Sequence, residues 1–357
     1  MAHATWKVIG ASGFVGSSIL ARLASEGVTL EAVEAPRLLT RTSDPDKLIA
    51  EARSLEGIID TLADSFAGCD LVINASGLAA PDQEDLAPLI GANALLPIII
   101  AIAAQRTGVR RVIHISSAAV LGAASVLTPT EETYPFSAYS FSKALGEKAL
   151  LKIRSFVEET AAQGRAPGSE QSEFPAAPSY APVQVAKDHA VEICIIRATS
   201  VQGRGRRTTQ AFAKIASSPL ASVAGSASRR TPVSSNYALA EFVHMIAAFE
   251  GELPAIVVQP WEGATTESVL VDAGRRQPIH LPEALCRAAV SAGYKVSELL
   301  GDRLTGPVRR VEVMWFGQDI DDSWARAHGL IPQARVQEVL RTAHSSLGSK
   351  RDRKFSD

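Results

Sequence analysis

Two side chains in the segment Ser137–Lys143 have the types and spacing that proton transfer requires. Tyr139 and Lys143 are four positions apart, so in a helix they lie on one face, one turn from each other. A free phenol is almost wholly protonated at neutral pH, and an adjacent ammonium favours the phenolate form. The pair therefore indicates a tyrosine acid/base, whereas Tyr139 by itself is more typical of a half-buried helical tyrosine.

Three glycines near the N-terminus follow the spacing G-x-x-G-x-x-G. Gly10, Gly13 and Gly16 come after a buried strand predicted over Trp6–Ile9 and at the start of a helix predicted over Phe14–Glu26. Such a turn lets the backbone approach a pyrophosphate at a helix N-terminus. Its place after the first strand favours a dinucleotide site over a glycine-rich turn without a ligand.

The sequence after this helix bears on the choice of cofactor. We predict the second strand over Arg37–Thr40, after an insertion over Val28–Pro36. An acidic residue at the end of this strand would accept the ribose hydroxyls of NAD, whereas an arginine would suit the 2′-phosphate of NADP. The strand end contains Thr40 and Arg41 and no acid, so we expect NADP ahead of NAD, unless Arg41 is a solvated loop cation.

Two further strands lead into small polar residues. Asp70–Ala75 is predicted to be a buried strand, and Arg111–Ile115 another that runs into Ser116 and Ser117. In an open parallel sheet, ligands bind at the carboxyl ends of the strands. These hydroxyls are therefore well placed to contact a ligand.

The apolar segment Leu86–Arg106 is predicted to be a helix that bends or restarts at Pro97. Asn93 within it is either a satisfied buried amide or a group that holds the framework of the site. The most apolar run, Leu95–Ala104, is shorter than the roughly 20 residues that a membrane span needs. We therefore expect a buried helix and no membrane partner.

The composition argues against several other classes of protein. The 357 residues are 46% hydrophobic and carry a formal net charge of -2, which allows a large core and gives no basic footprint for nucleic acid. The three cysteines are far apart and fit a reducing cytoplasm better than a disulfide framework or a metal site. The N-terminus lacks the regions of a signal peptide. We expect a cytoplasmic protein that binds no metal.

The alternation of strands and helices predicts an α/β fold with an open parallel sheet. Residues 155–183 are polar and rich in Gly and Pro, so we expect a mobile surface insertion there, and a disordered tail over residues 347–357. The predicted division is a sheet domain of residues 1–202 and 236–259 and a smaller substrate lobe of residues 203–235 and 260–346.

Taken together, the glycine turn, the Ser-Ser pair and the Tyr-x-x-x-Lys pattern resemble the extended branch of the short-chain dehydrogenase/reductase superfamily, the NAD(P)-dependent epimerase/dehydratase family. The resemblance implies a Rossmann-like, doubly wound parallel sheet. It places a catalytic hydroxyl at Ser117, the general acid/base at Tyr139 and its supporting cation at Lys143. The residues that it implies for cofactor binding are Gly10, Ser12, Gly13, Phe14, Val15, Gly16, Arg41, Ala75, Asn93, Tyr139 and Lys143.

The same resemblance implies a substrate residue in the C-terminal lobe. Arg229 precedes Asn236 by seven positions, where sugar-nucleotide enzymes of this family have the arginine that grips the substrate diphosphate. As a solvated loop cation, Arg229 would have no such role. The Arg-Pro signal of the family is Arg197-Ala198 here, which weakens the likeness of the substrate side. The family also implies a homodimer.

The expected activity is NAD(P)-dependent reduction or epimerisation at a carbonyl or secondary alcohol, of a nucleotide sugar, by hydride transfer with Tyr139 as the general acid/base. Alanines follow Ser117 where an Asp-Glu pair would indicate dehydration, so a dehydratase is not expected. Two alternatives stay open. One is a reductase of a small non-nucleotide carbonyl compound, and the other is a non-catalytic NADP-sensing or scaffold protein.

Overall fold

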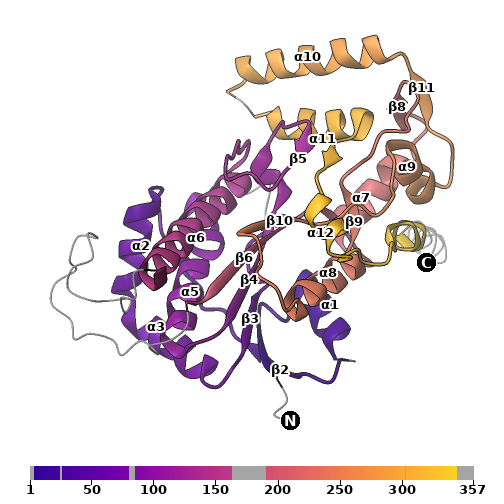
Figure 1. Cartoon of the computed structure of the whole chain (residues 1–357). Coiled ribbons are helices and arrows are strands. Elements are labelled where there is room, and N and C mark those ends of the chain that lie inside the picture. The colour runs from indigo at the N-terminus through magenta and orange to yellow at the C-terminus, as the bar shows by residue number, and fades with distance from the viewer. Residues whose placement is uncertain (1–3, 25, 80–84, 163–189, 302, 344–357) are drawn as a thin grey trace, which may run out of the picture. The chain divides into compact units, whose positions relative to one another are not determined.

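The computed structural model describes residues 4–24, 26–79, 85–162, 190–301 and 303–343, and the chain divides into two compact units (Figure 1). The first unit comprises residues 1–120, 130–197 and 243–257, and the second comprises residues 121–129, 198–242 and 258–357. Most of the predicted insertion at 155–183 and all of the predicted tail at 347–357 lie outside the described residues. Residues 155–162, however, are helical, so the insertion does not begin where the sequence suggested.

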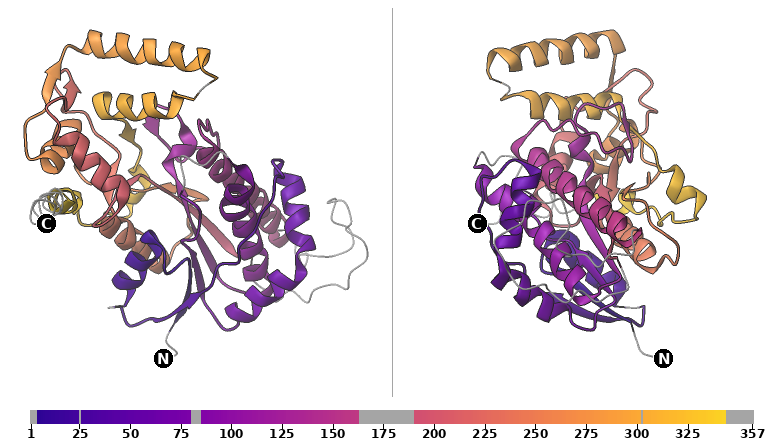
Figure 2. Two further views of the ribbon diagram at one scale, coloured as in Figure 1. Left: turned by 180° about the vertical axis from the view of Figure 1, so that it is seen from behind. Right: turned by 60° about the vertical axis from the view of Figure 1, so that its left-hand side comes forward.

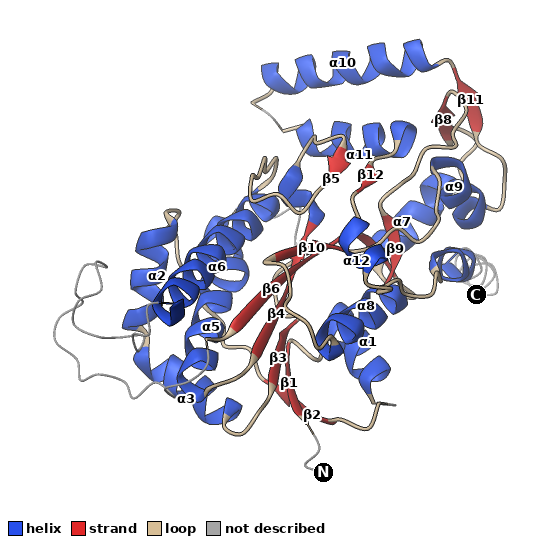
Figure 3. Cartoon of the chain, viewed as in Figure 1, coloured by secondary structure: helices blue, strands red, loops and turns tan. Residues whose placement is uncertain are grey.

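A six-stranded parallel sheet forms the centre of the first unit (Figure 3). Because β2 lies on one side of β1 and β3 lies on the other, the strand order reverses between β1 and β3, where sheets of this kind bind ligands. The predicted α/β fold is confirmed. In spatial order the strands are β10 (Ile256–Val258), β6 (Glu192–Ala198), β4 (Arg111–Ser117), β3 (Leu71–Asn74), β1 (Thr5–Ile9) and β2 (Thr29–Val33).

The second strand lies earlier in the chain than predicted. β2 falls inside the segment that the sequence suggested was an insertion, and it is a largely exposed edge strand. The predicted strand Arg37–Thr40 is instead irregular: Leu39 is 72% exposed, and the N–H of Thr40 donates to the carbonyl of Ala87. The prediction was wrong because a solvated edge strand lacks the apolar run by which buried strands are recognised. The residue that follows β2 is therefore Glu34.

Helices cover both faces of this sheet (Figure 2). α1 lies on one face, and α2, α3, α5 and α6 form a layer on the other, joined by a core of fully buried side chains such as Leu48, Ile59, Ile99 and Leu150. The bounds are Phe14–Leu23 (α1), Pro45–Ser54 (α2), Glu56–Phe66 (α3), Leu86–Ile90 (α4), Leu96–Thr107 (α5) and Ala138–Ala162 (α6).

The apolar segment before β4 forms one continuous helical stretch, Leu86–Thr107. It begins as α4, passes through the π-helical turn η1 (Gly91–Leu95) and continues as α5, with Pro97 in its first turn. The chain stays helical through Pro97, so in place of the predicted bend or restart the structure has a change from a π-helical to an α-helical turn just before the proline. The stretch is long and apolar enough to cross a membrane, but 78% of its apolar 18-residue window is buried inside the structure, as expected of a core helix.

The second unit is built from short strands and helices around its own core, which includes Ala213, Val223, Leu270 and Leu340. It contains residues 121–129, which the sequence analysis assigns to the sheet domain. The strands pair as β5 (Val126–Leu127) with β12 (Asp319–Ile320), β7 (Ser200–Gln202) with β9 (Val233–Ser235), and β8 (Ser222–Ala224) with β11 (Ile279–Leu281). The helices are α7 (Arg207–Ala216), the start of α8 (Asn236–Ala248), α9 (Thr266–Gly274), α10 (Glu283–Leu299), α11 (Thr305–Phe316) and α12 (Ser323–Ala327).

Close packing of α6 on η1 gives a first prediction. A Cβ at Gly146 would clash with the backbone carbonyl of Asn93, so we expect Gly146→Ala to lower the free energy of unfolding by about 1–3 kcal/mol. Gly57→Ala is the matched control, since a Cβ there meets nothing within 4 Å and should leave stability unchanged or raise it by up to about 1 kcal/mol. Urea unfolding of both variants measures the difference, and equal effects would contradict the close approach.

Candidate active site

The glycine turn has the geometry that a bound phosphate requires. Gly10 has a φ of 78°, in the left-handed region, and its carbonyl accepts the N–H of Gly13 (2.9 Å). A Cβ at Gly16 would clash with this same carbonyl, so α1 starts directly against the turn. Gly13 has no side chain to cap α1, and the first turn contains no acidic residue. The N–H groups and the positive end of α1 can therefore receive an anion.

The loop after β3 lies against this turn. A Cβ at Gly10 would come within 2.6 Å of the backbone of Ser76, and the N–H of Ala75 donates to the carbonyl of Ile9 (3.0 Å). The pairing of β1 with β3 thus brings the predicted cofactor residues Gly10 and Ala75 together at the point where the strand order reverses.

Tyr139 and Lys143 lie one turn apart on α6, as the spacing predicts. The Lys143 ammonium is buried, donates to the carbonyl of Ile115 on β4 (3.0 Å) and lies so close to Gly77 that a Cβ there would be 2.9 Å from Nζ. Burial lowers the pKa of Lys143 to about 8, so the side chain is still mainly a cation at neutral pH. Since Ile115 is two residues before Ser117, this hydrogen bond ties α6 to the end of β4.

The predicted hydroxyl groups lie where the sequence analysis expects them. Ser117 is the last residue of β4, is half-buried, and its Oγ accepts the N–H of Ala119 (3.2 Å). Tyr139 is also half-buried, in the first turn of α6, and its carbonyl accepts the hydroxyl of Ser142 (2.8 Å). The structure therefore presents a serine, a tyrosine and a lysine on adjacent elements, and their catalytic roles stay predictions.

A buried ion pair that the sequence analysis did not predict lies one turn further along α6. Glu147 and Arg197 are both buried, and the Arg197 Nη2 and Nε atoms lie 2.7 and 3.1 Å from the Glu147 Oε2. The hydroxyl of Ser116 also donates to Glu147, which fixes the residue next to Ser117. The negative charge of Glu147 opposes the effect of burial on the pKa of Lys143. The i,i+4 spacing from Lys143 to Glu147 was the available signal.

His114 on β4 is a second buried polar residue that was not predicted. Asn74 Oδ1 accepts the N–H of Ser76 (3.0 Å), so the Nδ2 of Asn74 is the atom that faces His114 Nδ1 (3.1 Å). Because an amide nitrogen can only donate, His114 Nδ1 accepts this hydrogen bond, and the proton of the neutral ring is on Nε2. Burial, and then the charge of Lys143, lowers the pKa of His114 well below its usual value. The neutral ring therefore adds no second positive charge near Lys143.

Asn93 is a satisfied amide that also holds the framework. From η1, its Oδ1 accepts the N–H of Leu78 (2.9 Å), while its Nδ2 donates to the Leu78 carbonyl (3.1 Å) and to the Oγ of Ser142 (3.0 Å). These bonds join the loop after β3 to α6 beside Lys143. The two interpretations of Asn93 are therefore compatible, and its contact with a cofactor stays a prediction.

Arg41 does not lie at a strand end, contrary to the prediction. It is eight residues beyond Val33, the last residue of β2 (41 minus 33), and it is exposed and paired with Asp85 (3.2 Å). The position directly after β2 is occupied by Glu34, an exposed carboxylate. The argument for NADP ahead of NAD rested on the wrong strand, and it no longer holds.

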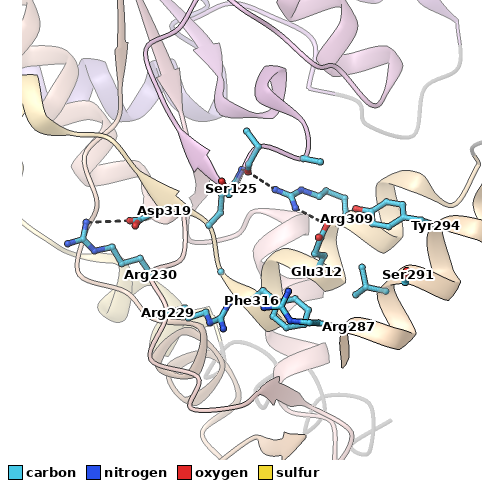
Figure 4. A pocket seen from close by; sticks show the side chains of 15 residues that line it. Ser125, Arg229, Arg230, Arg287, Ser291, Tyr294, Arg309, Glu312, Phe316 and Asp319 are labelled. Carbon is cyan, nitrogen blue, oxygen red and sulfur yellow. Dashed lines mark hydrogen bonds and ion pairs between the residues drawn. The ribbon is translucent and has the colours of Figure 1, made fainter. Parts of the chain in front are cut away.

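The predicted substrate residue Arg229 lines a cavity of about 710 Å³ within the second unit (Figure 4). The walls of the cavity come from the segment before β5, from α10 and α11, and from the segment after α11. The cavity is lined by more positively than negatively charged side chains. The charged residues that line it are Arg229, Arg230, Arg287, Arg309, Glu312 and Asp319.

Metal and thiol chemistry find little support in the described part of the chain. No group of three His, Cys, Asp or Glu side chains there could hold a metal ion. The three cysteines are buried free thiols, and burial raises the pKa of Cys69 to about 11 and that of Cys194 to about 12. Thiols that stay protonated at neutral pH are poor nucleophiles.

Comparison with known proteins agrees with the fold. Over 97% of this chain and 100% of the other, the structure resembles MoeE5 in complex with UDP-glucuronic acid and NAD, with a TM-score of 0.60 at 17% identity. Over 96% of this chain and 95% of the other, it resembles UDP-glucuronic acid 4-epimerase from Bacillus cereus in complex with NAD, with a TM-score of 0.58 at 15% identity. The structure thus has the same Rossmann-like fold as these solved structures.

A family profile agrees with the predicted resemblance. Residues 6–161 match the profile described as NAD dependent epimerase/dehydratase family. A curated protein of Stigmatella aurantiaca, 4-hydroxy-2-methyl-3-oxo-4-farnesyl-3,4-dihydroquinoline-1-oxide ketoreductase, is 28% identical over 155 residues. That match covers 41% of this chain and 44% of the relative, so the chain aligns with less than half of the relative's length.

The buried position of Lys143 gives a prediction about pH. The pKa of Lys143 is about 8 in the folded protein and 10.5 for a lysine side chain in water, so between these values the unfolded chain binds a proton that the folded protein has released. The wild type should therefore lose up to about 3 kcal/mol of stability as the pH falls from 10.5 to 8. In the Lys143→Met variant this group no longer titrates, so the variant should not show this loss of stability. The unfolding free energy of the variant minus that of the wild type should therefore be larger at pH 7 than near pH 10.

The matched control is Lys148→Met, an exposed lysine on the same helix. Its stability relative to wild type should be the same at both pH values, as measured by urea unfolding. A pH-independent difference for Lys143→Met would show that the ammonium is not desolvated.

Proposed function

We propose that this protein is an NAD-dependent oxidoreductase or epimerase that transfers a hydride to or from the carbon of a carbonyl or secondary alcohol. The observation that carries the proposal is the buried Lys143 ammonium, hydrogen-bonded to Ile115 near the end of β4 and one helical turn from Tyr139. The glycine turn and the open N-terminus of α1 suit the pyrophosphate of a dinucleotide. The family-profile match over residues 6–161 and the ketoreductase relative support this class of chemistry.

Each side chain of the site has a role in this proposal. Tyr139 exchanges a proton with the substrate oxygen, while the bound nicotinamide supplies or accepts the hydride. Ser117 orients that oxygen through its Oγ. Lys143 stabilises the phenolate form of Tyr139 by its charge, and Glu147 favours the charged form of Lys143. The neutral His114 adds no second positive charge near Lys143.

The cofactor that best fits the corrected second strand is NAD. Glu34 follows β2 directly, in the position from which a carboxylate accepts the ribose hydroxyls of NAD and repels the phosphate of NADP. The solved structures MoeE5 and the Bacillus cereus epimerase were determined with NAD, which supports the same choice.

For the substrate, we propose a nucleotide sugar. The neighbours with UDP-glucuronic acid or UDP-glucose in their sites support this class, and so does the arginine-lined cavity that contains Arg229. The ketoreductase relative favours a second candidate, reduction of a small carbonyl compound without a nucleotide. The two candidates differ in an assay with a panel of UDP-sugars and free ketones, because only the first requires the diphosphate.

Tyr139→Phe tests the chemistry. We expect turnover to fall by about 100-fold or more with cofactor affinity unchanged, because the ring remains but the transferable proton is lost. Turnover is followed by NADH absorbance for a reductase and by chromatography of the sugar product for an epimerase, and cofactor binding is followed by fluorescence titration. The control is Tyr134→Phe, an exposed tyrosine whose hydroxyl donates to Glu132 and which should keep full activity. Full turnover in Tyr139→Phe would overturn the assignment, and a wild type that binds NAD but transfers no hydride across the panel would favour a sensor.

Glu34→Ala tests the choice of cofactor. Loss of a charged hydrogen-bond acceptor should weaken NADH binding by about 10-fold or more and narrow the preference over NADPH. Arg41→Ala is the informative partner variant, because it should leave the binding of both cofactors unchanged. If Arg41→Ala instead weakens NADPH binding and Glu34→Ala has no effect, the preference is for NADP.

A further inference from the structure

The helix α10 has apolar residues on two of its sides. One side packs on α11, where a Cβ at Gly293 would lie 3.0 Å from a methyl carbon of Val308. On the same side, the hydroxyl of Ser297 lies 2.8 Å from the hydroxyl of Thr305. The other side, which we call the outer face, is exposed along the whole length of the helix. It is formed by Leu285, Ala288, Ala289, Ala292, Val296 and Leu299.

No described helix or strand of the second unit covers the outer face. Figures 1 and 2 show α11 below α10 and no described element of this unit above it. Leu285 is 58% exposed, Val296 is 46% exposed and Leu299 is 86% exposed. Single exposed apolar residues are ordinary in proteins, whereas a helix that is apolar on every side is normally buried. A continuous apolar face of this kind indicates an interaction surface.

The apolar positions of the outer face are symmetric about Ala292. Leu285 and Leu299 lie seven positions before and after it, and Ala288 and Val296 lie four positions before and after it. At 3.6 residues per turn, steps of four and seven return to nearly the same side of the helix, so these residues form one stripe.

This symmetry makes the outer face complementary to a second copy of itself. When two copies of α10 run antiparallel with Ala292 on the twofold axis, Leu285 of one copy lies opposite Leu299 of the other. The small Ala288 then lies opposite the larger Val296, and the two copies of Ala292 meet at the centre. A twofold interface requires a patch that matches itself in this way, because each contact occurs twice.

The charge of α10 favours a second copy over a lipid surface. Its charged residues are Glu283, Arg287, Lys295 and Glu298, so the helix has no net charge. In the antiparallel arrangement, Glu298 falls one position from Arg287 of the other copy, and Lys295 falls opposite the small Ala289. Opposite charges thus approach each other at both ends of the pair. Helices that lie on membranes instead carry an excess of basic residues on their polar face.

The size of the outer face suits a weak dimer. α10 has 17 residues and is therefore about 25 Å long. Pairing two such helices buries on the order of 1,000 Å² in total, which is near the lower limit for a specific interface. The alanines at the centre allow the two helices to approach closely. We expect a dissociation constant in the micromolar range.

We propose that the outer face of α10 is a self-association surface, which pairs antiparallel with the outer face of a second copy of this chain about a twofold axis at Ala292. The pairing uses the side of α10 that faces away from the cavity, whose lining on this helix includes Val290 and Tyr294. It does not depend on the proposed function, because no residue of the candidate active site takes part.

Ala292→Cys in the full-length chain tests the twofold axis. In the antiparallel pair the two new thiols face each other, so mild oxidation should give a disulfide-linked dimer on a non-reducing gel. Ala284→Cys is the matched control, an exposed alanine on the same helix whose two copies would be about 24 Å apart. The native cysteines are buried and should not cross-link. Equal cross-linking of both variants, or of neither, would overturn the antiparallel pair.

Leu299→Glu tests the association itself by analytical ultracentrifugation over a concentration series. A carboxylate buried in the pair is costly, so the wild type should reach twice the mass of this variant at high concentration, whatever other contacts it forms. Leu220→Glu, at an exposed leucine of the second unit outside α10, should behave like the wild type. Equal masses for the wild type and Leu299→Glu would overturn the proposal. If the masses are equal and the wild type alone binds phosphatidylglycerol vesicles, the outer face is instead a lipid-binding surface.

Discussion

A lysine ammonium cut off from water must be compensated by its surroundings, and the candidate active site is arranged around this requirement at Lys143. Its side chain is buried and finds a carbonyl on β4 and a carboxylate further along α6. Both partners are needed because a buried charge without them would release its proton. Because Lys143 lies on α6 and its carbonyl partner lies on β4, their hydrogen bond also holds α6 against the end of this strand.

The compensation continues through neighbouring residues. Glu147 lies near Lys143 and is itself buried, and Arg197 and the Ser116 hydroxyl donate hydrogen bonds to its carboxylate. Lys143, Glu147 and Arg197 together carry one net positive charge. Because the imidazole of His114 is neutral, it does not add to this net positive charge. In the proposed mechanism, a single positive charge near the half-buried Tyr139 would favour its phenolate form.

Local patterns predicted the elements that carry this chemistry. The glycine turn, the Tyr-Lys pair and the serine at a strand end depend on residues close in sequence, and all are present where the patterns indicated. The second strand was misplaced, because an exposed edge strand has no apolar run, and Leu38-Leu39 looked more like a strand than Thr29–Val33. That one error led to the expectation of NADP ahead of NAD, because it placed Arg41, and not Glu34, at the end of the second strand.

By itself, the sequence determined the α/β architecture and placed Tyr139 and Lys143 one turn apart on a helix, because periodicity and short spacings specify helices, strands and the faces they present. Only the tertiary structure decided which residues meet across long distances in the chain. The Glu147–Arg197 pair and the Asn74–His114 contact depend on the folded arrangement, because they join residues that are 50 and 40 positions apart in the chain. Such contacts depend on how strands pair and helices pack, and no local pattern encodes them.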